Sequence, residues 1–182
     1  MSQLAARSAS VFDVEAANAS LEGADPRDVL AHAVESFDAL ALSFSGAEDV
    51  VLVDMIAEIT DRVGIFCLDT GRLHAETLQF IDRVRDRYGL AIEFMYPEAE
   101  AVEAFVRAKG LFSFYEDGHQ ECCAIRKIEP LRRRLASADA WITGQRRDQS
   151  PTRTDVPLVQ RDGAFSSAER TLVKYNPLAA WS

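Results

Sequence analysis

The sequence lacks three features that would place it in a specialised class of protein. Three cysteines among 182 residues are too few for the disulfide framework of a small secreted protein, and a reducing cytoplasm is the simplest location. No apolar run approaches the ~20 residues that span a bilayer, and residues 1–20 lack the continuous apolar core of a secretory signal. The net charge is −9, which disfavours a general nucleic-acid-binding surface.

What remains is an ordinary globular composition, 48% hydrophobic and 27% charged, enough for one domain with a core. Strands are predicted at residues 40–44, 64–69, 91–96, 138–143 and 172–175, with a hairpin at 156–165. Helices are predicted at residues 14–21, 26–37, 50–62, 74–88, 98–108 and 122–135. Pro130 should kink or break the last of these. We expect residues 1–24 to form a tail and a short helix, and residues 25–182 to form one nucleotide-binding α/β domain.

The alternation of strands and helices predicts a Rossmann-like α/β fold, with a parallel sheet and helices on both faces. Polar groups follow three of the strands, at residues 43–49, 69–72 and 144–153. Ligands bind beyond the carboxyl ends of the strands in such sheets. If these three strands are adjacent, their loops should form one pocket.

The first of these loops joins an apolar strand to an apolar helix through two serines and a glycine. A helix N-terminus at this place offers free N–H groups and a positive dipole end to a phosphate or sulfate. Ser45 and Glu48, however, have the spacing of a capping box, which would satisfy the same donors within the chain. Both interpretations remain open on this stretch alone.

Adjacent cysteines at positions 122 and 123 are the second chemical signal. The following Arg126 and Lys127 would lower the pKa of a nearby thiol and favour thiolates, which bind soft metals and iron–sulfur clusters. Alternatively, the two cysteines serve as small hydrophobic residues at a helix start, or form a vicinal disulfide. Cys67 lies within an apolar strand and is predicted to be a buried, inert core residue.

Five short motifs stand in order along the chain. They are Ser43–Asp49 (SFSGAED), Leu68–His74 (LDTGRLH), Lys109–Tyr115 (KGLFSFY), Glu121–Lys127 (ECCAIRK) and Thr143–Ser150 (TGQRRDQS). Each motif alone is weak, whereas five in order are highly specific. Together they resemble the assimilatory adenylyl-sulfate (APS) reductases of bacteria, from about Asp28 to the end of the chain.

The resemblance implies an adenine nucleotide α-hydrolase-like fold, related to the PP-loop ATP pyrophosphatases. It implies reduction of APS to sulfite and AMP in sulfate assimilation and cysteine biosynthesis. A cysteine near the family's C-terminus attacks the sulfate sulfur, and thioredoxin then releases sulfite. We therefore expect APS or AMP and thioredoxin as partners, a homo-oligomer, a cytoplasmic location, and neither nucleic acid nor membrane as a partner.

The resemblance also assigns residues by position. Ser45 and Gly46 belong to the loop near the substrate, and Leu68 and Thr70 resemble residues on the adenosine side. The remaining counterparts are Gly144 in the nucleotide pocket, and Lys127 and Arg153 near the phosphosulfate. Cys122 and Cys123 resemble two of the four cysteine ligands of a [4Fe-4S] cluster, and this pair favours APS over PAPS as substrate.

The resemblance is incomplete, because the family's second cysteine pair and its nucleophilic cysteine have no counterpart up to Ser182. We expect the chain to be the N-terminal part of an APS reductase that is inactive alone. One alternative is a non-catalytic remnant that binds adenine nucleotides. Another is a PP-loop ATP-dependent adenylyltransferase, although Ala47 and Val50 occupy positions where that class usually has glycine and serine.

Overall fold

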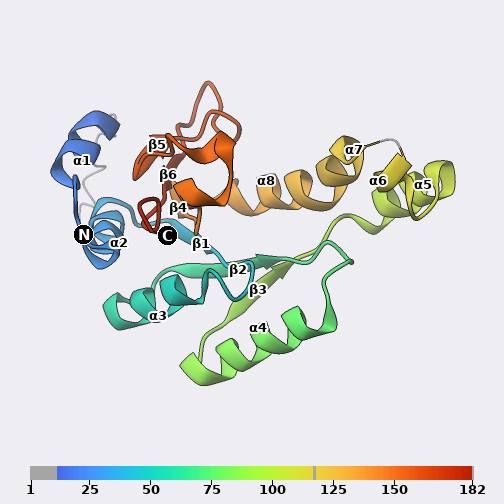
Figure 1. The fold of residues 1–182 in the computed structure, drawn as a ribbon, viewed down its shortest axis with the longest axis horizontal. Coiled ribbons are helices and arrows are strands. Elements are labelled where there is room, and N and C mark those ends of the chain that lie inside the picture. The colour runs from blue at the N-terminus through green and yellow to red at the C-terminus, as the bar shows by residue number, and fades with distance from the viewer. Residues whose placement is uncertain (1–11, 117, 182) are drawn as a thin grey trace, which may run out of the picture.

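One six-stranded sheet organises the computed structural model, which describes residues 12–116 and 118–181 (Figure 1). Its order is β3-β2-β1-β4-β6-β5, and each neighbouring pair is parallel except β5 and β6. The strands are β1 (Leu40–Ser43), β2 (Gly64–Leu68), β3 (Ile92–Met95), β4 (Ala140–Ile142), β5 (Val159–Arg161) and β6 (Val173–Tyr175). The predicted tail, residues 1–11, lies outside the described residues.

Helices cover both faces of the sheet, as predicted. Figure 1 shows α3 and α4 on one side, α8 on the other, and α5 to α7 extending past the end of the sheet. The α-helices are α1 (Val14–Ser20), α2 (Pro26–Ser36), α3 (Val50–Ile59), α4 (Ala75–Tyr88), α5 (Ala99–Lys109), α6 (Ser113–Glu116), α7 (Gln120–Cys123) and α8 (Glu129–Leu135). The π-helix η1 (Ala124–Ile128) and the 3₁₀ turns η2 (Arg147–Gln149) and η3 (Pro151–Arg153) complete the set.

Successive residues of a strand belong to two separate cores, because their side chains point to opposite faces of the sheet. Leu40 and Leu42 of β1 join a large core with residues of α1 to α4. Ala41 faces the other way, into a smaller core with Leu135 of α8 and Leu172. The strands are therefore buried on both faces, which explains their nearly continuous apolar character.

The predicted hairpin at residues 156–165 is wrong. Only β5 forms in this segment, and its antiparallel partner is the later strand β6. The Asp162 carboxylate accepts a hydrogen bond from the backbone N–H of Ala164 (3.2 Å), and the Asp162 N–H donates to the Leu172 carbonyl (2.8 Å). The chain therefore makes a longer loop after Asp162 and returns only at Leu172.

The predicted break at Pro130 is confirmed, since the helix predicted at 122–135 is divided into α7, η1 and α8. Pro130 stands in the first turn of α8, where a missing N–H costs least. In η1 the Glu129 N–H donates to the Ala124 carbonyl, the wider spacing of a π-helix. This wider turn lies directly after the cysteine pair and carries Arg126 and Lys127.

The helix α1 is attached to the main sheet through Asn18. Its side-chain amide donates to the Val159 carbonyl (2.7 Å) and accepts from the Val159 N–H (3.1 Å), and Ala17 and Leu21 are buried in the large core. A domain boundary near residue 24 stays a prediction. None of the described helices is both long and apolar enough to cross a membrane.

Candidate functional site

The carboxyl ends of β1 and β4 lie side by side, and the chain leaves them in opposite directions along the sheet. A crevice between two such strands is where open α/β sheets bind ligands. A cavity of about 220 Å³ lies there, and we call it the Ser45 cavity. Its lining consists of Ser43, Ser45, Glu48, Asp49, Leu131, Trp141, Thr143, Gly144, Gln145, Gln149 and Arg153.

Of the two interpretations of this loop, the capping box of Ser45 and Glu48 does not form. The helix α3 begins only at Val50, and the backbone N–H of Ser45 (2.9 Å) and its hydroxyl both donate to the carboxylate of Asp49. Glu48 instead accepts a hydrogen bond from the Gln149 side-chain amide (3.0 Å). The carboxylate of Asp49 is buried, and it therefore occupies donors that the sequence offered to a phosphate or sulfate.

Gly144 makes close approach to this carboxylate possible. A Cβ atom built on Gly144 would lie 2.9 Å from Cγ of Asp49, closer than real Cβ atoms come to other atoms. Only glycine therefore fits at this strand end while Asp49 holds Ser45. The two loops after β1 and β4 are packed against each other through this pair.

Polar side chains of the loop after β4 close the Ser45 cavity. Arg153 donates to the side-chain oxygen of Gln149, which also accepts from the backbone N–H of Arg146 (3.2 Å). The guanidinium of Arg146 lies 3.6 Å from the Glu48 carboxylate and 3.4 Å from that of Asp148. Arg153 is therefore the arginine of this loop that lines the Ser45 cavity, whereas the guanidinium of Arg146 is paired with carboxylates.

A second cavity, of about 300 Å³, lies between the loop after β2 and the segment from α6 to η1. We call it the Cys122 cavity. The described residues that line it include three cations and no carboxylate, so it favours an anionic ligand. They are Thr70, Arg72, Leu73, Phe114, Tyr115, Cys122, Cys123, Arg126 and Lys127.

Arg126 connects the two sides of the Cys122 cavity. Its guanidinium is buried and donates to the carbonyl of Thr70 (2.6 Å), which fixes the loop after β2 against η1. Its Nε has no hydrogen-bond partner among the described residues. A buried cation with an unused donor is costly unless an anion completes it.

The three cysteines differ in environment. Cys122 is buried and Cys123 half-buried on the wall of the Cys122 cavity. Cys67 faces the large core on the other face of the sheet, and burial raises the pKa of its thiol to about 11. The prediction of a buried, inert Cys67 agrees with this environment. Among the described residues no group of three or more His, Cys, Asp or Glu side chains could hold a metal ion.

The predicted site residues line two neighbouring cavities. The strands β2, β1 and β4 are adjacent as expected, but only the loops after β1 and β4 share a cavity. The Ser45 cavity contains Ser45, Gly144 and Arg153, and the Cys122 cavity contains Thr70, Lys127, Cys122 and Cys123.

Gly46 and Leu68 line neither cavity. Gly46 has φ +148°, a backbone conformation that residues with a side chain rarely adopt. Leu68 packs against the smaller core. Their ligand roles stay predictions. Lys127 and Leu131, about one helical turn apart, line different cavities, so the two cavities are neighbours along η1 and α8.

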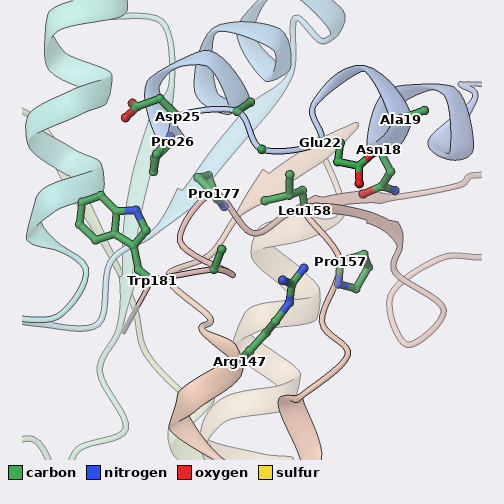
Figure 2. A pocket seen from close by; sticks show the side chains of 13 residues that line it. Asn18, Ala19, Glu22, Asp25, Pro26, Arg147, Pro157, Leu158, Pro177 and Trp181 are labelled. Carbon is green, nitrogen blue, oxygen red and sulfur yellow. The ribbon is translucent and has the colours of Figure 1, made fainter.

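Another hollow, of about 820 Å³, contains none of the predicted site residues. It lies between the α1–α2 connection, the segment before β5 and residues 177–181. Figure 2 shows the Arg147 side chain pointing into it between Pro157 and Pro177. The Nε of Arg147 donates to the Val156 carbonyl (2.8 Å), so this loop arginine faces away from the Ser45 cavity.

Comparison with known proteins assigns the fold and these loops to a family. Residues 39–182 match the phosphoadenosine phosphosulfate reductase domain. The chain belongs to this family. The match includes both cavities, because it begins just before β1 and reaches the end of the chain.

Two curated relatives of this reductase family are similar to the chain along most of its length. An adenosine 5'-phosphosulfate reductase of Pseudomonas aeruginosa (strain LESB58) is 57% identical over 171 residues, 93% of this chain and 64% of that protein. A probable chloroplastic 5'-adenylylsulfate reductase 1 of rice is 52% identical over 177 residues, 94% of this chain and 37% of that protein. The chain thus spans less than two thirds of the length of these relatives.

A solved structure confirms the predicted fold. The phosphoadenylyl-sulfate reductase of Candida auris, a phosphate complex, superimposes with a TM-score of 0.75 at 25% identity. The superposition covers 98% of this chain and 84% of that one. The expectation of an adenine nucleotide α-hydrolase-like α/β fold of the reductase family is therefore confirmed.

Several residues of the two cavities were not among the predicted site residues. Asp49 belongs to the first motif, but its role depends on a loop conformation that spacing does not specify. Trp141 and Gln145 line the Ser45 cavity from β4 and the loop after it. Arg126 stands close to the cysteine pair in the sequence. This proximity indicated that Arg126 lies near the cysteines, but it did not predict the contact with Thr70.

Proposed function

We propose that the chain binds adenylyl sulfate and forms the nucleotide-binding part of an enzyme that reduces it to sulfite and AMP. The observation that carries this proposal is the 57% identity over 171 residues to the P. aeruginosa adenosine 5'-phosphosulfate reductase. The chain spans 64% of that relative, so the activity of the whole protein is itself part of the proposal. Its biological role would be sulfate assimilation toward cysteine.

The arrangement of the two cavities supports an adenylyl sulfate ligand. The Ser45 cavity, at the switch point of the sheet, would hold the nucleoside beside Gly144 and the loop of Ser45. The phosphosulfate would extend toward Arg153 and Lys127, because guanidinium and ammonium groups match phosphate and sulfate oxygens. Donation from Ser45 to a bound nucleotide requires Asp49 to release the Ser45 N–H and hydroxyl, which it holds in this structure.

We also propose that Cys122 and Cys123 are two ligands of an iron–sulfur cluster. Both cysteines line one cavity, whose described lining residues include three cations and no carboxylate. The chain alone does not fit a complete [4Fe-4S] cluster, which takes four thiolates, because the sequence has three cysteines and Cys67 faces the opposite core. The other two ligands would have to come from outside these 182 residues.

The described residues contain no cysteine suited to attack the sulfate sulfur. Cys67 is 1% exposed, and its pKa is raised to about 11, so it is a protonated thiol at neutral pH. Cys122 and Cys123 are assigned above to the cluster. We therefore propose that the 182-residue chain binds the nucleotide without releasing sulfite, and that the nucleophile of the whole enzyme is a further cysteine.

Thioredoxin as the electron donor and a cytoplasmic location belong to the same proposal. Sulfur passes from the sulfate to the sulfite oxidation state, a two-electron reduction that a dithiol can supply. Assembly into a homo-oligomer is also proposed. Large exposed apolar side chains beside the Cys122 cavity, Leu111, Phe112 and Tyr115, offer a surface for protein contacts. Sedimentation velocity would show whether copies of the chain associate.

Titration calorimetry with AMP and with adenylyl sulfate tests nucleotide binding. We expect both to bind, and we expect Arg153→Met to weaken adenylyl sulfate by at least about tenfold, the effect of losing one charge-assisted hydrogen bond. Arg161→Met is the matched control, because Arg161 is exposed on β5 and lines neither cavity. Absence of binding, or an equal loss in both variants, would overturn the proposal.

Anaerobic incubation with iron and sulfide tests the cysteine pair separately. We expect the chain to hold less than one complete cluster, and iron retention to fall when Cys122 and Cys123 are both changed to alanine. Cys67→Ala is the control and should leave iron retention unchanged. Retention of iron by the Cys122→Ala, Cys123→Ala variant would show that the pair is not the ligand set.

A further inference from the structure

Lys174 is a buried lysine that forms no ion pair with a carboxylate of the described residues. It lies in the middle of β6, and only 8% of its surface is exposed. No ion pair is formed by its ammonium within the described part of the chain. Buried lysines are rarely kept unless they hold a specific partner, so the groups around this ammonium indicate what it does.

Two side chains, one from β4 and one from the loop after it, contact the ammonium group of Lys174. The register of β4 and β6 places it directly opposite Trp141, and its Nζ lies 5.1 Å from the centre of the Trp141 ring. The Nζ donates to Oε1 of Gln145 at 2.9 Å. Burial lowers the pKa of Lys174, and Arg153 lowers it further, while Asp162 opposes both effects.

The chemistry of lysine fixes which way the Gln145 amide points. An ammonium can only donate hydrogen bonds, whereas a glutamine amide has one accepting oxygen and one donating NH₂ group. The contact with Lys174 must therefore use the oxygen. The side chain of Gln145 lines the Ser45 cavity, and its NH₂ group donates to no described residue.

We propose that Lys174 is a positioning residue that holds Gln145 with its NH₂ group toward the Ser45 cavity, where it donates to an acceptor atom of the bound adenine nucleotide. This inference rests on the proposed function and adds a specificity-determining donor to it. Because the amide oxygen is taken by Lys174, Gln145 reads an acceptor of the ligand.

Calorimetry with AMP on single and double variants tests the proposal. Gln145→Met removes the donor and keeps the length of the side chain, and it should weaken AMP by about fivefold. Lys174→Met keeps the apolar stem beside Trp141 and frees the amide, and it should weaken AMP by about threefold to tenfold. In the Gln145→Met background, Lys174→Met should have no further effect, because the group it positions is gone. Lys174→Arg should restore most of the affinity.

A readout without ligand separates this inference from the proposed function. The side-chain amide resonances of Gln145 in ¹H–¹⁵N NMR spectra of the free chain should shift in Lys174→Met and stay near their original position in Lys174→Arg. If the unmodified chain fails to bind AMP, the proposed function is overturned, and with it the ligand role of Gln145. The NMR comparison still decides whether Lys174 positions the amide.

Two results would overturn the positioning role itself. One is an unchanged amide resonance in Lys174→Met. The other is a loss of AMP affinity in Lys174→Met that is just as large when Gln145 is already methionine, which would indicate a structural effect on the sheet. If Lys174→Met does not fold, Gln145→Glu serves instead, because a carboxylate still accepts from Lys174 but offers the cavity no donor. AMP binding as tight as in the unmodified chain would then refute the donor.

Discussion

The packing of Gly144 against Asp49 makes a sharp prediction for a single added methyl group. In Gly144→Ala the new Cβ would lie 2.9 Å from Cγ of Asp49 and still closer to one carboxylate oxygen. The Asp49 side chain is buried and cannot move freely into solvent. It must rotate away from Gly144, and this rotation breaks its hydrogen bonds from the N–H and hydroxyl of Ser45.

The cost can be worked out from these contacts. Overpacking of a tight site costs about 1–3 kcal/mol, and hydrogen bonds to a charged group contribute about 1.5–3 kcal/mol each. Because the two hydrogen bonds share one carboxylate and water replaces part of them, we expect a total loss of about 3 kcal/mol. For a domain of this size that loss corresponds to a fall in Tm of about 6–12 °C.

Thermal unfolding followed by circular dichroism measures this loss, and Gly163→Ala is its matched control. Gly163 lies in an open loop with no atom within 4 Å of an added Cβ, so its Tm should stay within about 2 °C of the original. Adding Asp49→Ala to Gly144→Ala removes the clash, and the combined loss should then be smaller than the sum of the two. An unchanged Tm in Gly144→Ala would refute the packing argument.

Two further predictions concern groups buried in the large core. Burial raises the pKa of Cys67 from 9.0 to about 11, so its thiol ionises later in the folded chain than in the unfolded chain, and the free energy of unfolding should fall as pH rises from 9 through 11. Urea titrations should show a shallower fall in Cys67→Ala; an identical pH dependence would contradict the role of this thiol. The hydroxyl of Tyr175 lies 3.0 Å from Nδ1 of His32, so Tyr175→Phe should lower the free energy of unfolding by about 1 kcal/mol in the same titrations at neutral pH, whereas equal stability would mean that this bond contributes nothing.

The order of strands and helices could be predicted because buried parallel strands read as short apolar runs between polar turns. Each predicted parallel strand, from residues 40–44 to residues 172–175, is found within two residues of its expected ends. The strand β5 differs, because its three residues pass from buried Val159 to exposed Arg161 without a sustained apolar pattern. Its pairing with β6 depends on the eleven-residue loop 162–172, where the Asp162–Gly163 pair in the sequence suggested a tight turn.

The details of the site were less predictable, because they depend on competition between groups at similar spacing. Glu48 and Asp49 are both within reach of Ser45, and the sequence pattern favoured Glu48 as a capping partner. The structure favours Asp49, because α3 begins later and the loop after β1 turns Asp49 back onto Ser45. The contact between Lys174 and Gln145 could not be predicted either, because it depends on the register of β4 and β6.

The two cavities are neighbours at the wide turn η1, next to Pro130. A proline cannot donate to the carbonyl one turn before it, and the chain responds with the wide turn η1 directly before α8. This turn places Arg126 in the protein interior, where it holds the carbonyl of Thr70 and draws the loop after β2 toward the cysteine pair. The same loop is thereby kept out of the Ser45 cavity, although β2 lies next to β1. The cations nearest the cysteines, Arg126 and Lys127, thus line a different cavity from Arg153.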